Sequence, residues 1–363
     1  MVNCMKVCWL SNYFSPYKIK LLNEIGRVLD LSCVILPGND GNRNSEWVLP
    51  ENVSFKTYII GKGYSKLIKK LAKENDILID SMYITRYGII ARRAFKKCNK
   101  LAIMQADGGN VVDRGFFLNH LMGYLMNKHD FFLSTGYSTR RYFSYYGVSE
   151  KKVYDYRFSS LSDEDMKNHK EMAKHKNDYR KELGIETDRF IIINVGRPIK
   201  VKGFNILLDA YMKTNITDKI DLYIVGGEPQ EDVKKIVEDN NLANVHFIGL
   251  LSTEELNKYY AASDMMAFTS RGDVWGLVVN EAMSFGLPVV SSDKNGAGIH
   301  FNSLDESVIM CELEDRGAYA KAILKLYSDK DFYEKQSRKS LEVINGYTIE
   351  NGAQDIINIL NRL

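Results

Sequence analysis

Short apolar, β-branched runs alternate with helix-like segments along nearly the whole chain, and this alternation constrains the fold more than any other feature. The apolar runs are residues 6–10, 33–36, 55–60, 77–79, 101–104, 131–134 and 153–156, then 190–195, 222–225, 245–248, 265–269, 288–291 and 308–311. Helical spacing is clearest at 17–29, 66–75, 204–214, 229–240 and 252–262. Strands that alternate with helices and lack hairpin signals predict parallel sheets covered on both faces.

Two such series in tandem predict an α/β protein of two doubly wound, Rossmann-like domains. The length of 363 residues agrees, because it exceeds one ordinary core and is too short for three. We expect the domains to meet near residue 163. The stretch 163–182 is highly charged and has almost no apolar face, so we interpret it as a solvated linker and helix. In such folds, ligands bind at the carboxyl ends of the strands.

Composition excludes several classes of protein. Apolar residues make up 45% of the chain, which rules out a disordered protein, and a net charge of +3 gives no global field for nucleic acid. Five cysteines without a C-x-x-C pair disfavour a disulfide scaffold or zinc ribbon and suit a reducing cytoplasm. The sequence contains no run of 18 apolar residues, so we expect no transmembrane helix. Lys6 interrupts the first apolar run, so we also expect no secretory signal.

Two cations follow the apolar run 190–195. Arg197 and Lys202 come after its end, between Gly196 and Gly203. The glycines let backbone approach a ligand closely, and the start of the next helix suits an anion. At about 4 Å and an effective dielectric near 20, each unit-charge pair is worth roughly 4 kcal/mol, which is enough to stabilise a departing phosphate. The alternative is an ordinary surface loop.

Two carboxylates follow the apolar run 265–269. Asp273 precedes a helix, and Glu281 lies about one turn inside that helix, so both can line one pocket. Carboxylates accept hydrogen bonds from hydroxyl-rich ligands. Gly276 and the free amides of the helix start offer donors to phosphate. The helix dipole alone would explain an early glutamate, but not the order of aspartate, tryptophan and glycine before it.

These motifs resemble glycosyltransferase family 4, the retaining, nucleotide-diphosphate-sugar enzymes of the GT-B fold. The resemblance rests on G-R-x4-K-G-F, V-G-G-E-P, V-H-F-I-G and D-V-W-G-L-V-V-N-E-A-M-S-F-G-L-P-V-V. It is specific over residues 190–299 and diffuse over 1–158. The last motif looks most like bacterial members that build capsular, exopolysaccharide or O-antigen repeats on a lipid carrier.

The resemblance implies a role for each matching residue near the diphosphate. Arg197 and Lys202 match the pair that grips the donor diphosphate. Gly276 and Leu277 match the backbone segment beneath it.

The same resemblance covers the rest of the donor. Glu281 matches the carboxylate that holds the nucleotide ribose. Asp273 stands where many members have the first glutamate of E-x7-E, which addresses hydroxyls of the transferred sugar, and it is one methylene shorter. Ile248 and Leu250 match the stretch that brackets the base.

The resemblance also assigns the domains. Gly226 and Gly227 match a strand-end turn in the donor crevice. We expect an acceptor-binding N-terminal domain over 1–162, a donor-binding domain over 163–345, and a last helix within 346–363 that crosses back to the first domain. The GT-B fold implies that the two domains face a central cleft.

By resemblance, the reaction moves a hexosyl unit, with a UDP-sugar favoured as donor, to a hydroxyl of a glycan or polyprenyl-diphosphate-linked acceptor. No protein nucleophile is needed, and the departing phosphate takes the acceptor proton. The sequence has no ligand cluster of metal spacing, so we expect neither metal nor cofactor.

Two features of the first half point to the acceptor. The loop 11–17 lacks the glycine pair of many family members, so we expect it to shape the acceptor side or simply to start a helix around Pro16. Asp107 follows the run 101–104 and replaces a family histidine as a catalytic candidate, or else forms a turn before Gly108.

Residues 61–100 contain eleven basic and three acidic side chains. Lysines interleave with leucine and isoleucine over 66–73, and such a face suits an anionic cytoplasmic leaflet or is merely solvated. We therefore expect a cytoplasmic protein with possible peripheral membrane contact at the inner face of the cell membrane.

Two other functions remain open, and a third is disfavoured. A non-catalytic glycosyltransferase-like subunit would not need Arg197, Lys202 and Glu281. A nucleotide-sugar 2-epimerase of the same fold would form product without an acceptor. A nicotinamide dehydrogenase is disfavoured because no G-x-G-x-x-G follows the first apolar run.

Overall fold

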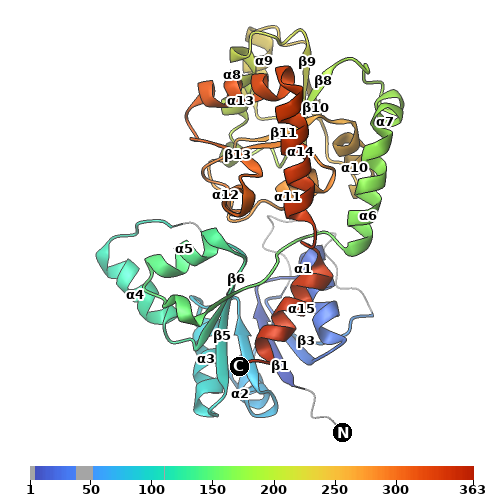
Figure 1. Cartoon of the computed structure of the whole chain (residues 1–363). Helices are drawn as coiled ribbons and strands as arrows, with labels where there is room; N and C mark the ends of the chain where they lie inside the picture. Colours follow the sequence, from blue (N-terminus) through green and yellow to red (C-terminus); the bar gives the residue numbers. More distant parts are fainter. Residues whose placement is uncertain (1–4, 38–51, 110) are drawn as a thin grey trace. The chain divides into compact units, whose positions relative to one another are not determined.

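A computed structural model describes residues 5–37, 52–109 and 111–363. The chain divides into two compact units, each built on a parallel sheet (Figure 1). Unit 1 comprises Met1–Ser159 and Thr348–Leu363, and unit 2 comprises Ser160–Tyr347. Among the described residues, no helix is both long and apolar enough to cross a bilayer.

Unit 1 has a seven-stranded sheet of order β3-β2-β1-β4-β5-β6-β7, and every strand pair in it is parallel. Its strands are β1 (Lys6–Ser11), β2 (Asp30–Ile35), β3 (Lys56–Ile59), β4 (Ile77–Asp80), β5 (Leu101–Ala106), β6 (Phe131–Ser134) and β7 (Val153–Asp155). Its helices are α1 (Pro16–Gly26), α2 (Tyr64–Glu74), α3 (Arg86–Lys97), α4 (Phe116–Met126), α5 (Tyr137–Tyr145), the short η1 (Glu150–Lys152) and α15 (Ile349–Leu360).

Helices α2 to α5 cover one face of this sheet. Ala102 and Met104 are two residues apart in β5, so their side chains point to the same face. Ala102 packs among residues of α2 and α3 such as Phe95, whereas Met104 packs with Met126 of α4 and Phe143 of α5. The β1–α1–β2 crossover runs the other way along the sheet, so α1, with α15 beside it, covers the opposite face.

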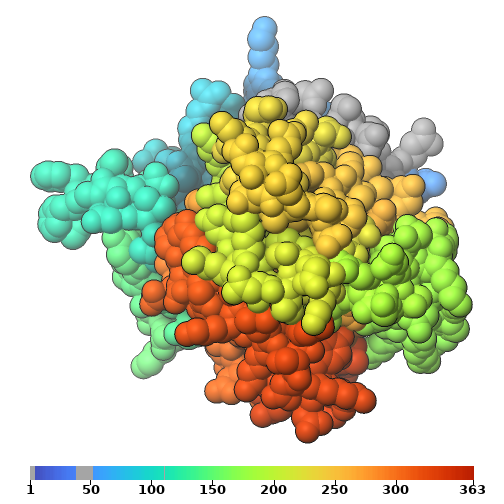
Figure 2. All heavy atoms as spheres, turned by 90° about the horizontal axis from the view of Figure 1, so that it is seen from above, coloured from blue at the N-terminus to red at the C-terminus, as the bar shows by residue number. Residues whose placement is uncertain are grey.

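Unit 2 has a six-stranded parallel sheet of order β10-β9-β8-β11-β12-β13. Its strands are β8 (Phe190–Val195), β9 (Ile220–Val225), β10 (Val245–Ile248), β11 (Met265–Phe268), β12 (Val289–Ser292) and β13 (Val308–Cys311). Its helices are α6 (Asp163–Met172), η2 (Ala173–His175), α7 (Lys176–Glu182), η3 (Lys200–Lys202), α8 (Phe204–Lys213), α9 (Glu231–Asp239), α10 (Thr253–Ala262), α11 (Leu277–Ser284), α12 (Gly296–Asp305), α13 (Arg316–Ser328) and α14 (Lys330–Ile344). Figure 2 shows α8 in yellow-green and α9 in yellow on the surface of this unit.

In both sheets the central strands are apolar on both faces, as the sequence pattern predicts. In β8, Ile192 packs with α8 and α13 on one face, and Ile191 packs with Ala262 of α10 on the other. The prediction of two doubly wound parallel sheets is confirmed.

The prediction that residues 163–182 form a solvated linker and helix is correct for the helix and wrong for the linker. This segment forms α6 and α7, which pack on unit 2. His169 of α6 is buried, and its ring stacks on Phe285 with centroids 4.2 Å apart. Arg180 of α7 is only 4% exposed.

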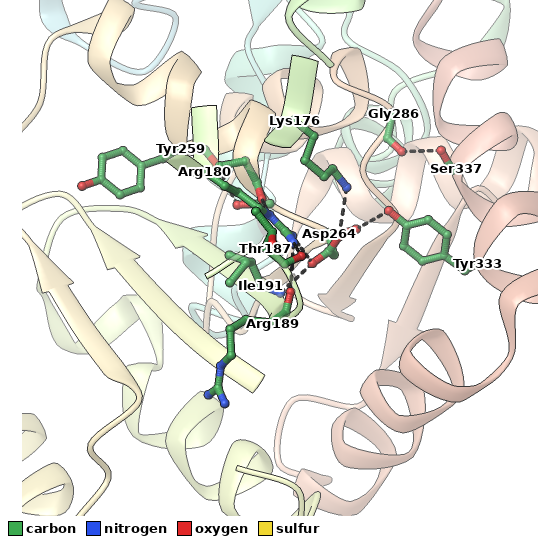
Figure 3. Close-up of polar contacts among 12 residues, drawn as sticks. Lys176, Arg180, Thr187, Arg189, Ile191, Tyr259, Asp264, Gly286, Tyr333 and Ser337 are labelled. Atoms are coloured by element: carbon green, nitrogen blue, oxygen red, sulfur yellow. Dashed lines mark hydrogen bonds and ion pairs between the residues drawn. The ribbon is translucent and has the colours of Figure 1, made fainter. Parts of the chain in front are cut away.

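Charged partners make this burial possible. The Asp264 carboxylate accepts hydrogen bonds from Arg180 Nη2 at 2.6 Å and Lys176 Nζ at 2.9 Å (Figure 3). A count of apolar residues cannot detect a helix that docks through ion pairs.

Candidate functional site

Two loops at the carboxyl edge of the unit 2 sheet are joined to each other. The loop after β8 and the loop after β11 follow strands that pair side by side. The Thr269 hydroxyl donates to the Gly203 carbonyl at 3.0 Å, and the Ser270 hydroxyl donates to the Val201 carbonyl at 3.1 Å. These contacts fix the backbone on which the predicted cation and carboxylate stand.

Lys202 and Asp273, both predicted from the sequence, form an ion pair. Lys202 Nζ lies 2.5 Å from Asp273 Oδ2, and the two side chains are 17% and 19% exposed. The same ammonium lies 5.1 Å from the centre of the Phe268 ring. A partly desolvated cation with one carboxylate partner can exchange that partner for another anion.

Two arginines stand on the same edge of the sheet. Arg197 directly follows Gly196 at the end of β8, is exposed, and has no ion-pair partner among the described residues. Arg271, which the sequence analysis missed, lies in the loop after β11, and its Nη1 donates to the Lys200 carbonyl at 3.0 Å. Its place two residues before Asp273 was the available signal.

The start of α11 lies in the same loop region and has no side-chain cap. Gly276 precedes Leu277, the first residue of α11, with φ of +95°, and a Cβ there would lie 2.3 Å from Asn295 Nδ2. The glycine is therefore required by both conformation and space. Uncapped amides at a helix start are donors for an anion.

Asn295 is a second residue that the sequence analysis missed. It is fully buried, its Nδ2 donates to the Trp275 carbonyl at 2.7 Å, and its Oδ1 accepts from Gly298 N at 2.5 Å. Asn295 thus positions the loop that leads into α11. The predicted Trp275 is itself buried and donates to Asn280 Oδ1 at 2.9 Å, so it supports the loop from within.

The predicted strand-end residues gather along the neighbouring strands. Gly226 and Gly227 follow β9, and both amides donate to the carbonyl of Ile248 at the end of β10. A Cβ on Gly226 would lie 2.5 Å from the Gly196 carbonyl oxygen, so a side chain would separate the ends of β8 and β9. Leu250 lies two residues beyond β10 and is 73% exposed.

Glu281 lies on α11 and is held by two hydroxyls. The Ser160 hydroxyl donates to its Oε1 at 3.1 Å, and the Tyr260 hydroxyl donates to its Oε2 at 3.2 Å. Burial raises the pKa of Glu281, and these two hydrogen bonds oppose the shift. Asp273 lies in the loop before α11 and Glu281 lies on α11 itself. Asp273 pairs with Lys202, whereas Glu281 accepts hydrogen bonds from Ser160 and Tyr260.

Unit 1 has a polar pocket of about 190 Å³ at the carboxyl ends of its strands. The predicted loop 11–17 and Asp107 both contribute to its lining. The lining is rich in hydroxyl groups from Ser11, Tyr13, Ser15, Tyr17, Ser81 and Tyr83. Such a surface offers both donors and acceptors to a hydroxylated ligand.

Lys18 is a third residue that the sequence analysis missed. It is 3% exposed, and its Nζ lies 3.2 Å from Gln105 Oε1 and 3.7 Å from Asp107 Oδ1. The same ammonium lies 4.8 Å from the centre of the Trp9 ring. The signal was its spacing, since Lys18 shares the inward stripe of α1 with Leu22 and Ile25.

The basic stretch 61–100 is not one continuous exposed face. Arg92 is 4% exposed, and its Nη1 lies 3.3 Å from Nε2 of His129, which lies 3.3 Å from Asp80 Oδ2. The other cations of α2 and α3 are exposed. Across the described residues, no group of three or more His, Cys, Asp or Glu side chains is arranged to hold a metal ion.

Residues 175–343 match the family model of glycosyl transferases group 1. A D-inositol 3-phosphate glycosyltransferase of Corynebacterium kroppenstedtii is 30% identical over 162 residues, 42% of this chain and 36% of that protein. The lipopolysaccharide core biosynthesis glycosyltransferase LpsE of Rhizobium meliloti is 25% identical over 169 residues, 46% of this chain and 48% of that protein. The chain therefore spans less than half the length of these curated relatives.

Solved structures match over nearly the whole chain. HepE of Anabaena, in complex with UDP, gives a TM-score of 0.76 at 16% identity, over 99% of this chain and 100% of that one. Sucrose-phosphate synthase of Thermosynechococcus elongatus gives 0.72 at 16% identity, over 99% and 98%. At these identities the likeness shows the fold, which is GT-B. Residues 175–343, a little under half of the chain, are similar to the glycosyl transferases group 1 family.

Proposed function

We propose that this protein is a retaining glycosyltransferase that moves a hexosyl unit from a nucleotide-diphosphate sugar to an acceptor hydroxyl. The observation that carries the proposal is the Lys202–Asp273 ion pair on a loop that leads into the uncapped start of α11. A cation, a carboxylate and free amides on one strand edge match the needs of a diphosphate joined to a sugar.

The donor side of the proposal lies in unit 2. Arg197, Lys202 and the amides at Gly276 and Leu277 bind the diphosphate, and Glu281 accepts hydrogen bonds from the ribose. The base lies near Ile248 and Leu250, with the glycines after β9 beside it. UDP is the favoured nucleotide, and the HepE structures solved with UDP and with UDP-glucose support that choice.

The ion pair has a specific part in this proposal. When the diphosphate arrives, the Lys202 ammonium exchanges its carboxylate partner for phosphate oxygens and so remains paired. Asp273 is then released to accept a hydrogen bond from a sugar hydroxyl. Because Asp273 is shorter than the glutamate of many relatives, the hydroxyl it reaches helps to select the sugar.

The acceptor side lies in unit 1, at the pocket lined by Asp107 and the loop 11–17. In the reaction, the bond between the anomeric carbon and the diphosphate breaks, and the acceptor oxygen bonds to the same carbon. The acceptor oxygen enters on the face that the phosphate leaves, so configuration is retained without a protein nucleophile, and the acceptor proton passes to the departing phosphate oxygen. Asp107 orients the acceptor hydroxyl.

We also propose a role in surface polysaccharide synthesis, on a glycan or polyprenyl-diphosphate-linked acceptor at the inner face of the cell membrane. Two relatives support it by their names, the lipopolysaccharide core enzyme LpsE and an uncharacterized protein of a cps region in Klebsiella pneumoniae.

Calorimetric titration with UDP tests the donor site. Lys202→Ala should weaken UDP binding at least about 10-fold and lower transfer by roughly 10²-fold to 10³-fold, because it removes a cation from the developing charge. Lys200→Ala is the matched control: its side chain is exposed on the same short helix, and the carbonyl that Arg271 uses is retained.

Circular dichroism of each variant shows whether weaker UDP binding or slower transfer results from misfolding. Wild-type protein that binds no nucleoside diphosphate, or equal UDP affinity in Lys202→Ala and wild type, would overturn the proposed donor site. Product formed from a donor sugar without any acceptor would instead indicate an epimerase.

A further inference from the structure

Helix α4 of unit 1 exposes apolar side chains that globular proteins normally bury. Phe116 is 71% exposed, Phe117 86%, Leu118 54%, Leu121 52% and Tyr124 60%. In the whole helix only Gly123 and Met126 are buried. A contiguous apolar surface of this kind marks a site of interaction with a protein or a membrane.

The surface of α4 stands open. Figure 1 places α4 at the outer edge of unit 1, and Figure 2 shows teal atoms of this part of the chain at the molecular surface. Between α4 and the region after α5 there is a groove of about 620 Å³, lined by Phe116, His120, Tyr124, Lys128 and Tyr145 among others. The aromatic side chains that line this groove add to the exposed apolar surface of α4.

The charges around α4 favour an anionic partner. Between residues 111 and 128 the only acidic side chain is Asp113, and it accepts hydrogen bonds from Gly115 N and Asn119 Nδ2. Arg114 precedes the helix and Lys128 follows it. The Lys128 ammonium lies 4.4 Å from the centre of the Tyr124 ring, so an aromatic ring and a cation sit together at the end of the apolar surface.

The exposed cations of α2 and α3 belong to the same side of unit 1. Helices α2 to α5 cover one face of the unit 1 sheet, as the packing of Ala102 and Met104 shows. The exposed cations there are Lys66, Lys69, Lys70, Lys73, Arg86, Arg93, Lys96 and Lys97. An apolar helix and a cationic surface on one face fit a layer that is apolar inside and anionic at its boundary.

We infer that α4 is a membrane-insertion helix that lies in the interface of an anionic bilayer. Phe116, Phe117, Leu118 and Leu121 enter the boundary between headgroups and acyl chains, and the cations of α2 and α3 contact anionic headgroups. A second copy of this chain is a poorer occupant, because the same cations would then face each other.

The inference stands on unit 1 alone and deepens the proposed function, on which it rests. Phe116, the first residue of α4, follows the pocket residue Asp107 closely in the chain. Insertion of α4 would therefore hold the pocket near the headgroups, where the diphosphate-sugar end of a lipid-linked acceptor lies.

Co-sedimentation of the full chain with lipid vesicles tests this inference. Wild-type protein should bind vesicles that contain phosphatidylglycerol and bind pure phosphatidylcholine vesicles more weakly. Phe116→Ser/Phe117→Ser should lower binding to the anionic vesicles at least about 10-fold, since both rings lose their apolar contact with lipid. Leu304→Ser is the control, because Leu304 is 52% exposed and belongs to unit 2 rather than to the face formed by α2 to α5.

A second measurement reports insertion directly. The tryptophan emission of the Phe117→Trp variant, after subtraction of the wild-type spectrum, should shift to the blue on anionic vesicles. Adding Lys69→Ser and Lys70→Ser to this variant should weaken its binding to anionic vesicles at low salt. The protein that still binds should show the same blue shift.

Three results would overturn the inference. The first is that wild-type protein does not bind anionic vesicles, and the second is that the double-serine variant binds them as well as wild type does. The third is that wild-type protein is a dimer in sedimentation, that the double-serine variant is a monomer, and that vesicles change neither state. UDP titration of the double-serine variant separates failure of this inference from failure of the proposed function. The substitutions lie outside unit 2, so the variant should bind UDP as wild type does.

Discussion

His169, one of two buried histidines in the described part of unit 2, should make the stability of this unit depend on pH. His169 lies on α6, its Nδ1 is 2.7 Å from Ser284 Oγ, and its ring stacks on Phe285. Burial lowers the pKa of His169 from 6.5 to about 4, with the nearby Asp165 carboxylate opposing the shift. The folded state therefore keeps this ring neutral, while the unfolded state takes up a proton below its ordinary pKa.

The sign of the effect follows from linkage. The stability that neutral His169 contributes is complete above about pH 6.5 and is lost as pH falls towards 4, by up to roughly 3 kcal/mol. His169→Phe keeps the stacking and cannot titrate, so its Tm should fall less than the wild-type Tm between pH 7 and pH 5. Calorimetry measures both, and His175→Gln, at an exposed site, serves as control. Parallel Tm curves for wild type and His169→Phe would contradict the prediction.

At the scale of elements, one carboxylate joins a helix and two strands of unit 2. Asp264 stands just before β11, and besides Lys176 and Arg180 of α7 it accepts from Ile191 N in β8 at 2.7 Å. Arg180 also donates to the carbonyls of Ala262 and Thr187. Helix α7 is thus attached to the sheet edge by a partly buried polar network, in addition to the packing of Tyr179 on the apolar cluster around Ile191.

Removing that carboxylate should be strongly destabilising. Asp264→Ala leaves the Arg180 guanidinium buried without its counter-charge, and we expect a loss of about 3–5 kcal/mol in the unfolding free energy. Glu182 lies on the same helix as Arg180, and Glu182→Ala, which breaks its exposed pair with Lys258 of α10, should cost at most about 0.5 kcal/mol. Urea unfolding followed by circular dichroism compares the two variants, and similar losses would refute a structural role for Asp264.

At the scale of the whole molecule, the end of the chain completes the first unit. Helix α15 buries Ile356, Ile357 and Leu360 beside α1. Arg157, just after β7, donates through Nε and Nη2 to the two carboxylate oxygens of Asp355, each at 2.7 Å. Unit 1 is therefore made from segments almost two hundred residues apart in sequence.

Gly352 tests this closure. An alanine inside a helix normally stabilises it by about 1 kcal/mol relative to glycine. Here a Cβ would lie 2.3 Å from the Arg157 carbonyl oxygen, so Gly352→Ala should instead lower the Tm of unit 1 by several degrees. Gln354→Ala, at an exposed position of the same helix, should leave it nearly unchanged. A higher Tm for Gly352→Ala would mean that α15 does not pack closely on unit 1.

Much of the fold was predictable because local pattern and tertiary environment agree. Strands such as β6, β8 and β10 have the bounds that their apolar runs predict. Polar residues in the loops after apolar runs, such as Asp107 after β5 and Lys202 after β8, lie at the carboxyl edge because all strands of a parallel sheet end there. Burial of α6 and α7 was not predictable, since its partners, Asp264 and Phe285, are distant in sequence.

The sequence alone determined two parallel sheets and the edge at which chemistry-bearing residues collect, because alternation of apolar runs and helices is a local property. Only the tertiary structure decided that Lys202 pairs with Asp273, that Asn295 holds the loop before α11, and that Lys18 is buried beside Asp107. It also decided which apolar helix remains uncovered. Pairing and exposure depend on which surfaces meet after folding, and no run of consecutive residues carries that information.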